Sequence, residues 1–343
     1  MKRIMLLLAA AALLCIPAAA GYDTSAQAMI IYHAADGRVL AEKNADRPLP
    51  MASTTKLMTA LVVLERCDLS ETVEILPTHT RTEGSSMYLK AGEEYTVEEL
   101  LTGLLLASGN DAALALADHT AGSERAFAQL MNERAAELGM DNTHYVNSSG
   151  LPAEDHFSSA RDLAILMGEC RRNADFCRIN GLTSASVHGK TLRNHNKLLT
   201  RCKGVNGGKT GYTKRAGRCL VSSCERDGLE LICVTLNDRS DWDDHAALYA
   251  AAYRDYCACT IPTGRVLARV PRGDGGEAAV TVKDELRLCL PRGTSVGMTA
   301  ELPRFVLGAK RAGTHAGWLH VYAEGEEKAS WELIWAAEQQ DPS

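Results

Sequence analysis

The chain has 343 residues and is 46% hydrophobic, which is enough apolar material for one large domain and a second, small one. Its formal net charge is −6 and its sequence pI is about 6.0. An acidic chain does not attract phosphate groups through its overall charge, so we expect no nucleic acid and no anionic membrane surface among its partners.

Residues 1–20 have the pattern of a signal peptide. Two basic residues, Lys2 and Arg3, precede the apolar run 4–16, and small residues follow as far as Ala20. A retained transmembrane anchor usually has about 20 apolar residues, so we favour cleavage after Ala20 over retention of the segment. We therefore expect an exported protein, placed in the cell envelope or periplasm or secreted.

The first pattern after this segment is a β-hairpin. Residues 28–32 and 38–42 alternate between apolar and polar side chains. The two runs flank Asp36 and Gly37, a pair typical of tight hairpin turns. This part of the chain therefore predicts two antiparallel strands.

A serine and a lysine three residues apart lie at the expected start of a helix. Leu57, Leu61 and Leu64 recur at helical spacing, and Ser53 and Lys56 precede them. The two side chains then share one helix face, so Lys56 can act as the base that activates the Ser53 hydroxyl, provided that its pKa is lowered. Alone the pattern is weak, because a helix cap followed by a solvated lysine has the same sequence.

Residues 100–106 predict the next helix, and Thr96 with Glu99 forms a capping box at its start. The turn that follows carries Ser108 and Asn110. A hydroxyl and a carboxamide on a tight turn can relay a proton and hold an amide carbonyl. The same S-x-N sequence is also common at ordinary helix starts.

The sequence Lys209-Thr210-Gly211 is the rarest of the three short patterns. It lies in a glycine-rich strand, where the backbone can approach a bound molecule closely. A lysine and a threonine there can bind a carboxylate. The backbone N–H of Tyr212, after Gly211, can donate to an oxyanion that develops during a reaction.

The remaining patterns are mostly strands. Residues 218–224 and 229–236 are apolar runs separated by a turn. After Pro262 alternation with period two dominates, so we place a domain boundary there and expect a small all-β domain over 262–343. Residues 21–261 mix helix and strand patterns, and the predicted fold class is α+β.

Ten cysteines follow the predicted cleavage site, and they are spread through apolar segments. A domain of this size needs no disulfide framework, and buried cysteines behave as small hydrophobic residues. Cys257 and Cys259 are too close for an ordinary bridge, and no neighbouring histidine cluster completes a zinc site with them. We interpret most of the ten as free thiols and predict no metal ligands.

The three short patterns, taken together and in this order, resemble the S-x-x-K, S-x-N and K-T-G motifs of penicillin-recognising serine enzymes. The resemblance extends to the low-molecular-mass D-alanyl-D-alanine carboxypeptidases. It is carried by residues 50–59, 84–87, 107–113, 147–151 and 193–199 and covers the chain from about residue 26 to about residue 335.

The resemblance implies a catalytic domain over residues 21–261 with a β-lactamase/transpeptidase-like fold, an antiparallel sheet flanked by helices. It implies a serine carboxypeptidase that removes D-alanine from peptidoglycan stem peptides ending in D-Ala-D-Ala, is inhibited by β-lactam antibiotics and requires no cofactor. Carried over by motif, Ser53 is the acylated nucleophile and Lys56 its base. Ser108 then relays a proton to the departing D-alanine.

The same resemblance assigns the binding residues. Asn110 positions the substrate amide, and Lys209 with Thr210 binds the terminal carboxylate. The backbone N–H groups of the nucleophilic serine and of Tyr212, next to Gly211, form the oxyanion hole.

Two features differ from the family pattern. Some relatives carry an arginine after the K-T-G segment to grip the substrate carboxylate. Here the corresponding stretch 238–245 reads DRSDWDDH, so the residue that completes this site stays open. Many relatives also end in an amphipathic helix that lies on the membrane. Residues 339–343 are polar, and we predict no C-terminal membrane anchor.

Three alternative functions were weighed. A class A β-lactamase shares the motifs, but its E-x-x-L-N segment does not occur between Asn110 and Lys209. A catalytically silent wall-binding protein would be expected to lack Ser53, Lys56 or Lys209, and all three are present. Transpeptidase or endopeptidase side activity stays open, because the same acyl-enzyme can pass to water or to an amine.

Overall fold

The computed structural model describes residues 4–6 and 22–337. The predicted signal peptide, apart from residues 4–6, and the polar segment 339–343 therefore lie outside the described residues. Within the described part of the chain, no helix is both long and apolar enough to cross a membrane.

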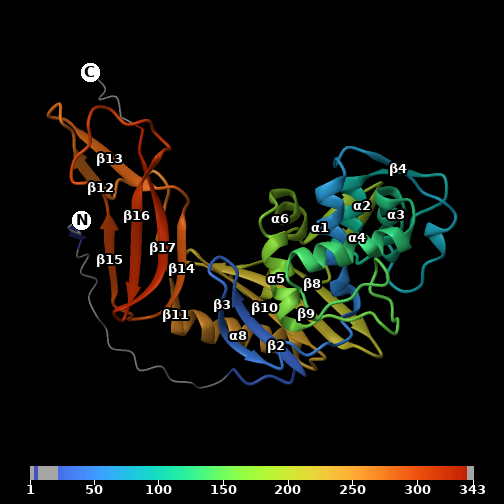
Figure 1. The fold of residues 1–343 in the computed structure, drawn as a ribbon. Helices are drawn as coiled ribbons and strands as arrows, with labels where there is room; N and C mark the ends of the chain where they lie inside the picture. Colours follow the sequence, from blue (N-terminus) through green and yellow to red (C-terminus); the bar gives the residue numbers. More distant parts are fainter. Residues whose placement is uncertain (1–3, 7–21, 338–343) are drawn as a thin grey trace. The chain divides into compact units, whose positions relative to one another are not determined.

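The described part of the chain divides into two compact units, the first formed by residues 22–253 and the second by residues 4–6 and 254–337 (Figure 1). The second unit begins before strand β11 (Tyr256–Ile261), whereas the change in sequence pattern lies at Pro262. The difference arises because β11 pairs with a strand of the second unit.

An antiparallel sheet of five strands forms the centre of the first unit, in the order β3-β2-β10-β9-β8. Its strands are β2 (Ala28–His33), β3 (Arg38–Lys43), β8 (Val205–Thr213), β9 (Gly217–Arg226) and β10 (Leu229–Leu236). The predicted hairpin at residues 28–42 is confirmed by the pairing of β2 with β3. Strand β8, which carries the K-T-G motif, lies at the edge of the sheet, where its backbone is open to a bound molecule.

Nearly every residue of β10 is buried, which indicates that both faces of this sheet are covered. Helices provide the cover on both sides. Helix α5 (Ala160–Cys170) packs on β10 beside Ile232. Helix α8 (Asp241–Asp255) covers the other face of the sheet, where its His245 is hydrogen-bonded to Ser222. Ser222 points away from the face of Ile232, because the adjacent residue, Ser223, is the strand partner of Ile232. The predicted α+β fold with a sheet flanked by helices is confirmed.

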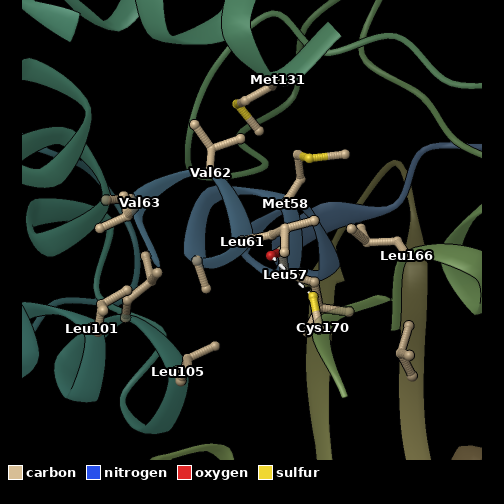
Figure 2. Packing of buried hydrophobic residues seen from close by; sticks show 14 of the residues in the cluster. Leu57, Met58, Leu61, Val62, Val63, Leu101, Leu105, Met131, Leu166 and Cys170 are labelled. Atoms are coloured by element: carbon tan, nitrogen blue, oxygen red, sulfur yellow. Dashed lines mark hydrogen bonds between the residues drawn. The ribbon is translucent and has the colours of Figure 1, made fainter. Parts of the chain in front are cut away.

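The helical part of the first unit surrounds one buried helix, α1 (Lys56–Arg66), which begins directly after the short helix η1 (Ala52–Thr55). Figure 2 shows its apolar side chains packed against neighbouring helices, with Leu57 and Leu61 among them. The other elements here are η2 (His79–Arg81), α2 (Val97–Leu106), α3 (Asn110–Ala121), α4 (Glu124–Glu137), α6 (Ala174–Asn180), α7 (Leu198–Arg201) and the hairpins β4–β5 (Thr72–Glu74, Glu94–Thr96) and β6–β7 (Ser184–Val187, Lys190–Arg193). The capping box of Thr96 with Glu99 is confirmed.

The second unit is all-β in the part that the structure describes after α8. Strand β11 pairs with β14, and the larger sheet has the order β1-β15-β16-β17-β13-β12. The strands are β1 (Ile4–Leu6), β12 (Ala268–Pro271), β13 (Glu277–Val282), β14 (Leu286–Pro291), β15 (Val296–Glu301), β16 (His315–Ala323) and β17 (Glu326–Trp335). Alternate residues such as Val280, Val321 and Leu333 form its own core. The expectation of an all-β C-terminal part is confirmed.

The ten cysteines between residues 67 and 289 are all free thiols in the structure, and most of them are buried. Six of the ten lie in the core, and their state as free thiols in the exported protein stays a prediction.

Buried His245 should make the stability of the first unit depend on pH. Its ring bonds to the hydroxyls of Ser222 and Thr235, and burial lowers its pKa to about 3. Between pH 6.5 and pH 3 this histidine is protonated in the unfolded chain, where its pKa is about 6.5, but stays neutral in the folded chain. The contribution of neutral His245 to stability is therefore complete above pH 6.5 and is lost as the pH falls towards 3. We expect the free energy of unfolding, measured with urea, to fall by up to about 1.4 kcal/mol per pH unit in this range because of this group. His245→Asn should reduce that slope, and His188→Asn, at an exposed site, should not.

Candidate active site

Ser53 and Lys56 meet at the junction of η1 and α1. Lys56 Nζ donates to Ser53 Oγ at 3.0 Å, to Asn110 Oδ1 at 2.7 Å and to the Ser149 carbonyl at 2.5 Å. The lysine side chain is completely buried. These three acceptors match the three donors of an ammonium group, so the amine is fixed beside the Ser53 hydroxyl.

The surroundings favour the neutral amine of Lys56. Burial lowers its pKa well below the usual value, and the charge of Lys209 lowers it further, while Asp111 opposes both effects. A lysine with a lowered pKa can accept the Ser53 proton near neutral pH. The structure thus brings together Ser53 and Lys56, the predicted nucleophile and the predicted base.

A second serine–lysine pair comes from two distant segments. Lys209 Nζ donates to Ser108 Oγ at 3.0 Å and to the Thr210 carbonyl at 2.9 Å. Ser108 lies between α2 and α3 with φ of +59°, a left-handed backbone that aims its buried hydroxyl at the lysine. Burial lowers the pKa of Lys209 to about 7. Small changes in surroundings can therefore change the charge of this lysine at physiological pH.

Asn110 starts helix α3 and contacts both the lysine base and a loop. Its Oδ1 accepts from Lys56, and its Nδ2 donates to the Glu83 carbonyl. The neighbouring Asp111 is almost fully buried and accepts from Ser86 Oγ at 2.5 Å and from two backbone N–H groups of the same loop. Sequence reasoning missed Asp111. An acid in the first turn of a helix was the available signal.

Strand β8 packs directly against the nucleophile. A Cβ at Gly211 would lie 3.0 Å from the backbone nitrogen of Ser53 and 3.0 Å from the Met51 carbonyl, so only glycine allows this approach without a shift. The Tyr212 side chain is 68% exposed. The structure therefore places Gly211 next to the backbone nitrogen of Ser53.

Two asparagines that the sequence did not single out as site residues hold β8 beside Lys209. Asn180 accepts from the Gly208 N–H at 2.6 Å and donates to the Gly208 carbonyl at 3.0 Å. Asn196 donates to the Gly207 carbonyl at 3.2 Å. Both side chains are buried. They fix the backbone that carries Lys209, a role that has no signature in the local sequence.

The loop after α4 supports the other side of Ser53, and sequence reasoning assigned it no role. His156 Nδ1 accepts from the Val146 N–H, so its Nε2 carries the proton and donates to Thr55 Oγ1 at 2.8 Å. Burial lowers the pKa of His156 to about 4, consistent with a neutral ring. The histidine therefore fixes η1 from behind.

Gly150 of the same loop approaches η1 so closely that alanine should disturb the site. Its φ is +86°, and a Cβ would lie 2.0 Å from the Ala52 carbonyl oxygen and 2.9 Å from the Ser53 nitrogen. We expect Gly150→Ala to slow acylation of Ser53 by a fluorescent penicillin at least about tenfold, because misplacement of reacting groups is costly. Gly122→Ala is the matched control, since Gly122 has a φ of +75° but no neighbour within 4 Å. Equal rates for both variants would contradict this role.

The stretch after β10 contains one arginine, Arg239, which is exposed, and most of its acids are engaged with other residues. Asp241 accepts two hydrogen bonds from Arg218, and Asp238 accepts one from Ser25 Oγ. Arg218 lies opposite Tyr212 in the pairing of β9 with β8. Thr210, two residues from Tyr212, therefore shares a sheet face with this arginine.

Potential metal ligands lie elsewhere. Within the described residues, the group whose ligand atoms lie close enough to share an ion is Cys67, Glu71 and His119, near the ends of α1 and α3. It includes none of the residues around Ser53.

This fold and these two pairs define a penicillin-recognising serine enzyme of the transpeptidase fold. Comparison with known sequences agrees, since the family described as D-alanyl-D-alanine carboxypeptidase, peptidase S11, matches residues 16–240. The chain belongs to the D-alanyl-D-alanine carboxypeptidase family, and the resemblance seen in the motifs is confirmed.

Individual relatives support this placement. The chain is 37% identical over 219 residues to D-alanyl-D-alanine carboxypeptidase DacF of Bacillus subtilis, covering 61% of this chain but only 56% of that protein. It is 37% identical to DacB2 of Mycobacterium tuberculosis, covering 66% of this chain and 82% of that protein. The crystal structure of PBP3 from Streptococcus pneumoniae, described as a peptidoglycan synthesis regulatory factor, superposes with a TM-score of 0.78 at 25% identity, over 93% of this chain and 100% of that one.

Proposed function

We propose that this protein removes the terminal D-alanine from peptidoglycan stem peptides ending in D-Ala-D-Ala, through an acyl-enzyme on Ser53. The observation that carries the proposal is the buried Lys56 amine, 3.0 Å from Ser53 Oγ and with a lowered pKa. The proposed substrate lies outside the cytoplasmic membrane, where the predicted export signal would send the enzyme.

In the first step Lys56 takes the proton of Ser53, and Ser53 Oγ attacks the carbonyl carbon of the penultimate D-alanine. The backbone N–H groups of Ser53 and Tyr212 stabilise the oxyanion. The C–N bond then breaks, and Ser108, beside Lys209, passes a proton to the amine of the departing D-alanine. Water hydrolyses the ester in the second step and restores the Ser53 hydroxyl.

Asn110 is proposed to position the substrate amide. Both ends of its carboxamide already have partners, Lys56 and the Glu83 carbonyl. Binding of a substrate amide therefore requires exchange of one of these hydrogen bonds, which would couple substrate binding to the position of Lys56.

Lys209 and Thr210 are proposed to bind the terminal carboxylate. Arg218 is engaged elsewhere, because it donates two hydrogen bonds to Asp241 of α8 and lies on the sheet face of Ser222, opposite to the face of Gly211 that packs on Ser53. We therefore expect Arg218→Gln to leave KM for the peptide unchanged, as in the control Arg172→Gln at an 81% exposed side chain. A KM raised about tenfold in Arg218→Gln alone would assign this arginine to the site.

The site favours a carboxypeptidase over a class A β-lactamase. Among the described residues, no hydrogen bond joins a carboxylate to Ser53 or Lys56, whose partners are Asn110 and the Ser149 carbonyl. A glutamate that drives water onto the acyl bond would be expected in a β-lactamase. β-Lactams should therefore acylate Ser53 and form an acyl-enzyme that hydrolyses slowly, so that they act as inhibitors.

The direct test is release of free D-alanine from diacetyl-L-lysyl-D-alanyl-D-alanine. The wild-type protein should release D-alanine, and Ser53→Ala should release none while keeping its thermal unfolding temperature. Ser70→Ala, at an exposed serine, should retain full activity. No release by folded wild-type protein would overturn the proposal and favour a wall-binding role.

A further inference from the structure

A tight turn joins α7 to the edge strand β8 and packs against the end of β9. The Val205 N–H donates to the Cys202 carbonyl at 3.2 Å, and the Glu225 N–H donates to the Gly204 carbonyl at 2.9 Å. Val205 is also paired with Cys224 in the register of β8 with β9. The turn therefore brings Cys202 next to Cys224, which is 22 residues away in sequence.

The two sulfur atoms converge on the same turn. Cys224 Sγ donates to the Lys203 carbonyl oxygen at 3.5 Å, and the thiols of Cys202 and Cys224 are close enough for each to shift the pKa of the other. A Cβ at Gly204 would lie 3.1 Å from Cys224 Sγ, so the sulfur points into the turn.

Arg226 completes the cluster. Its Nη2 donates to Cys202 Sγ at 3.4 Å and its Nε to the Lys203 carbonyl at 2.8 Å. The guanidinium stacks on the Tyr253 ring, 4.7 Å from the ring centroid, which holds it in place. A fixed cation at a thiol stabilises the thiolate, which is the reactive form of cysteine.

The two thiols differ in acidity. The neighbouring Cys224 thiol lowers the pKa of Cys202 to about 6, with help from Arg226 and against the effect of burial. The Cys202 thiol and burial raise the pKa of Cys224, so Cys224 stays protonated. One thiolate poised beside a protonated partner is the arrangement found where disulfides form readily.

Cys202 also lies close to the surface. It is 9% exposed, and both chain neighbours, Arg201 and Lys203, are exposed. Cys170, Cys219 and Cys233, in contrast, are completely buried, and burial raises the pKa of each.

We propose that Cys202 and Cys224 are a modification site that closes to a disulfide bond when the protein meets a small-molecule or protein disulfide. The Cys202 thiolate attacks one sulfur of that oxidant, whose S–S bond breaks and releases one thiol. Cys224 then loses its proton and its sulfur attacks Cys202 Sγ, which releases the second thiol. The protein loses two electrons and two protons, and the oxidant is reduced to two thiols.

The bond would join the start of β8 to the end of β9. The closed loop contains Lys209 and the whole K-T-G segment. A disulfide restricts the unfolded chain, so oxidation should raise the thermal unfolding temperature of the first unit. Such bonds persist outside the cytoplasm, where the export signal would send this protein.

The test treats the native full-length protein with oxidised glutathione, followed by denaturation and peptide mapping without reduction. We expect two free thiols to disappear and peptides containing residues 202 and 224 to be linked. Because trypsin leaves Cys219 and Cys224 in one peptide, Cys219→Ser is the matched control and should still form the bridge. Cys202→Ser should lose no thiol, and Cys224→Ser should keep glutathione on Cys202.

Three outcomes would overturn the proposal. Folded wild-type protein could keep all its thiols, Cys202 could retain glutathione in the presence of Cys224, or the bridge could involve another cysteine. Thermal unfolding of each untreated variant shows whether it is folded, so a folding defect cannot be taken for the absence of the bridge.

Discussion

Lys56→Gln should slow acylation of Ser53 by a fluorescent penicillin by about 10³-fold or more, because it removes the base and keeps a hydrogen-bonding side chain. The reason is geometric. Lys56 Nζ is 3.0 Å from Ser53 Oγ, and no other basic group is hydrogen-bonded to that hydroxyl among the described residues. Stopped-flow measurement of label incorporation gives the rate, with Lys90→Ala at an exposed lysine as the control.

The rate of acylation of Ser53 should also depend on pH. Burial and Lys209 lower the pKa of Lys56, so the neutral amine becomes available well below pH 10.5. The acylation rate of the wild-type protein should rise with pH and level off above the lowered pKa of Lys56. A rising limb that survives unchanged in Lys56→Gln would assign the base to another group.

Lys209→Gln should reduce kcat/KM for the D-Ala-D-Ala peptide about 10²- to 10³-fold. The substitution removes the partner of Ser108 and, in our proposal, one cation at the substrate carboxylate. Because burial lowers the pKa of Lys209 to about 7, the wild-type kcat/KM should fall as the pH rises above 7 and the lysine loses its charge.

Lys209→Arg provides the matched comparison, since arginine stays charged at these pH values. If it retains measurable activity, the falling limb near pH 7 should be absent from its profile. A limb that stays near pH 7 in Lys209→Arg would show that a different group titrates there.

The three motifs predicted the chemistry of the site because each is a short run of residues with its own local geometry. Ser53 and Lys56 share a helix start, and Lys209 lies on a glycine-rich edge strand. Each pattern is weak alone, and the resemblance of all three, in this order, to the family motifs indicated their roles. The sequence could not show that Lys56 and Lys209 are both completely buried. That burial depends on packing between distant segments.

The supporting residues were not predicted, and the reason is physical. Asn180 contacts the backbone of Gly208, and Gly150 contacts the backbone of Ala52. Contacts with a distant backbone leave no periodic pattern in the sequence. The Cys202–Cys224 pair was missed for a similar reason, since only the turn before β8 and the pairing with β9 bring the two together.

The most direct test of the central claim is mass spectrometry of the intact protein after brief exposure to a penicillin, followed by peptide mapping. The account predicts a mass increase of one penicillin, located on Ser53 and absent from Ser53→Ala. It also predicts that the adduct disappears only slowly. An adduct on any other residue, or folded protein with no adduct, would contradict the account.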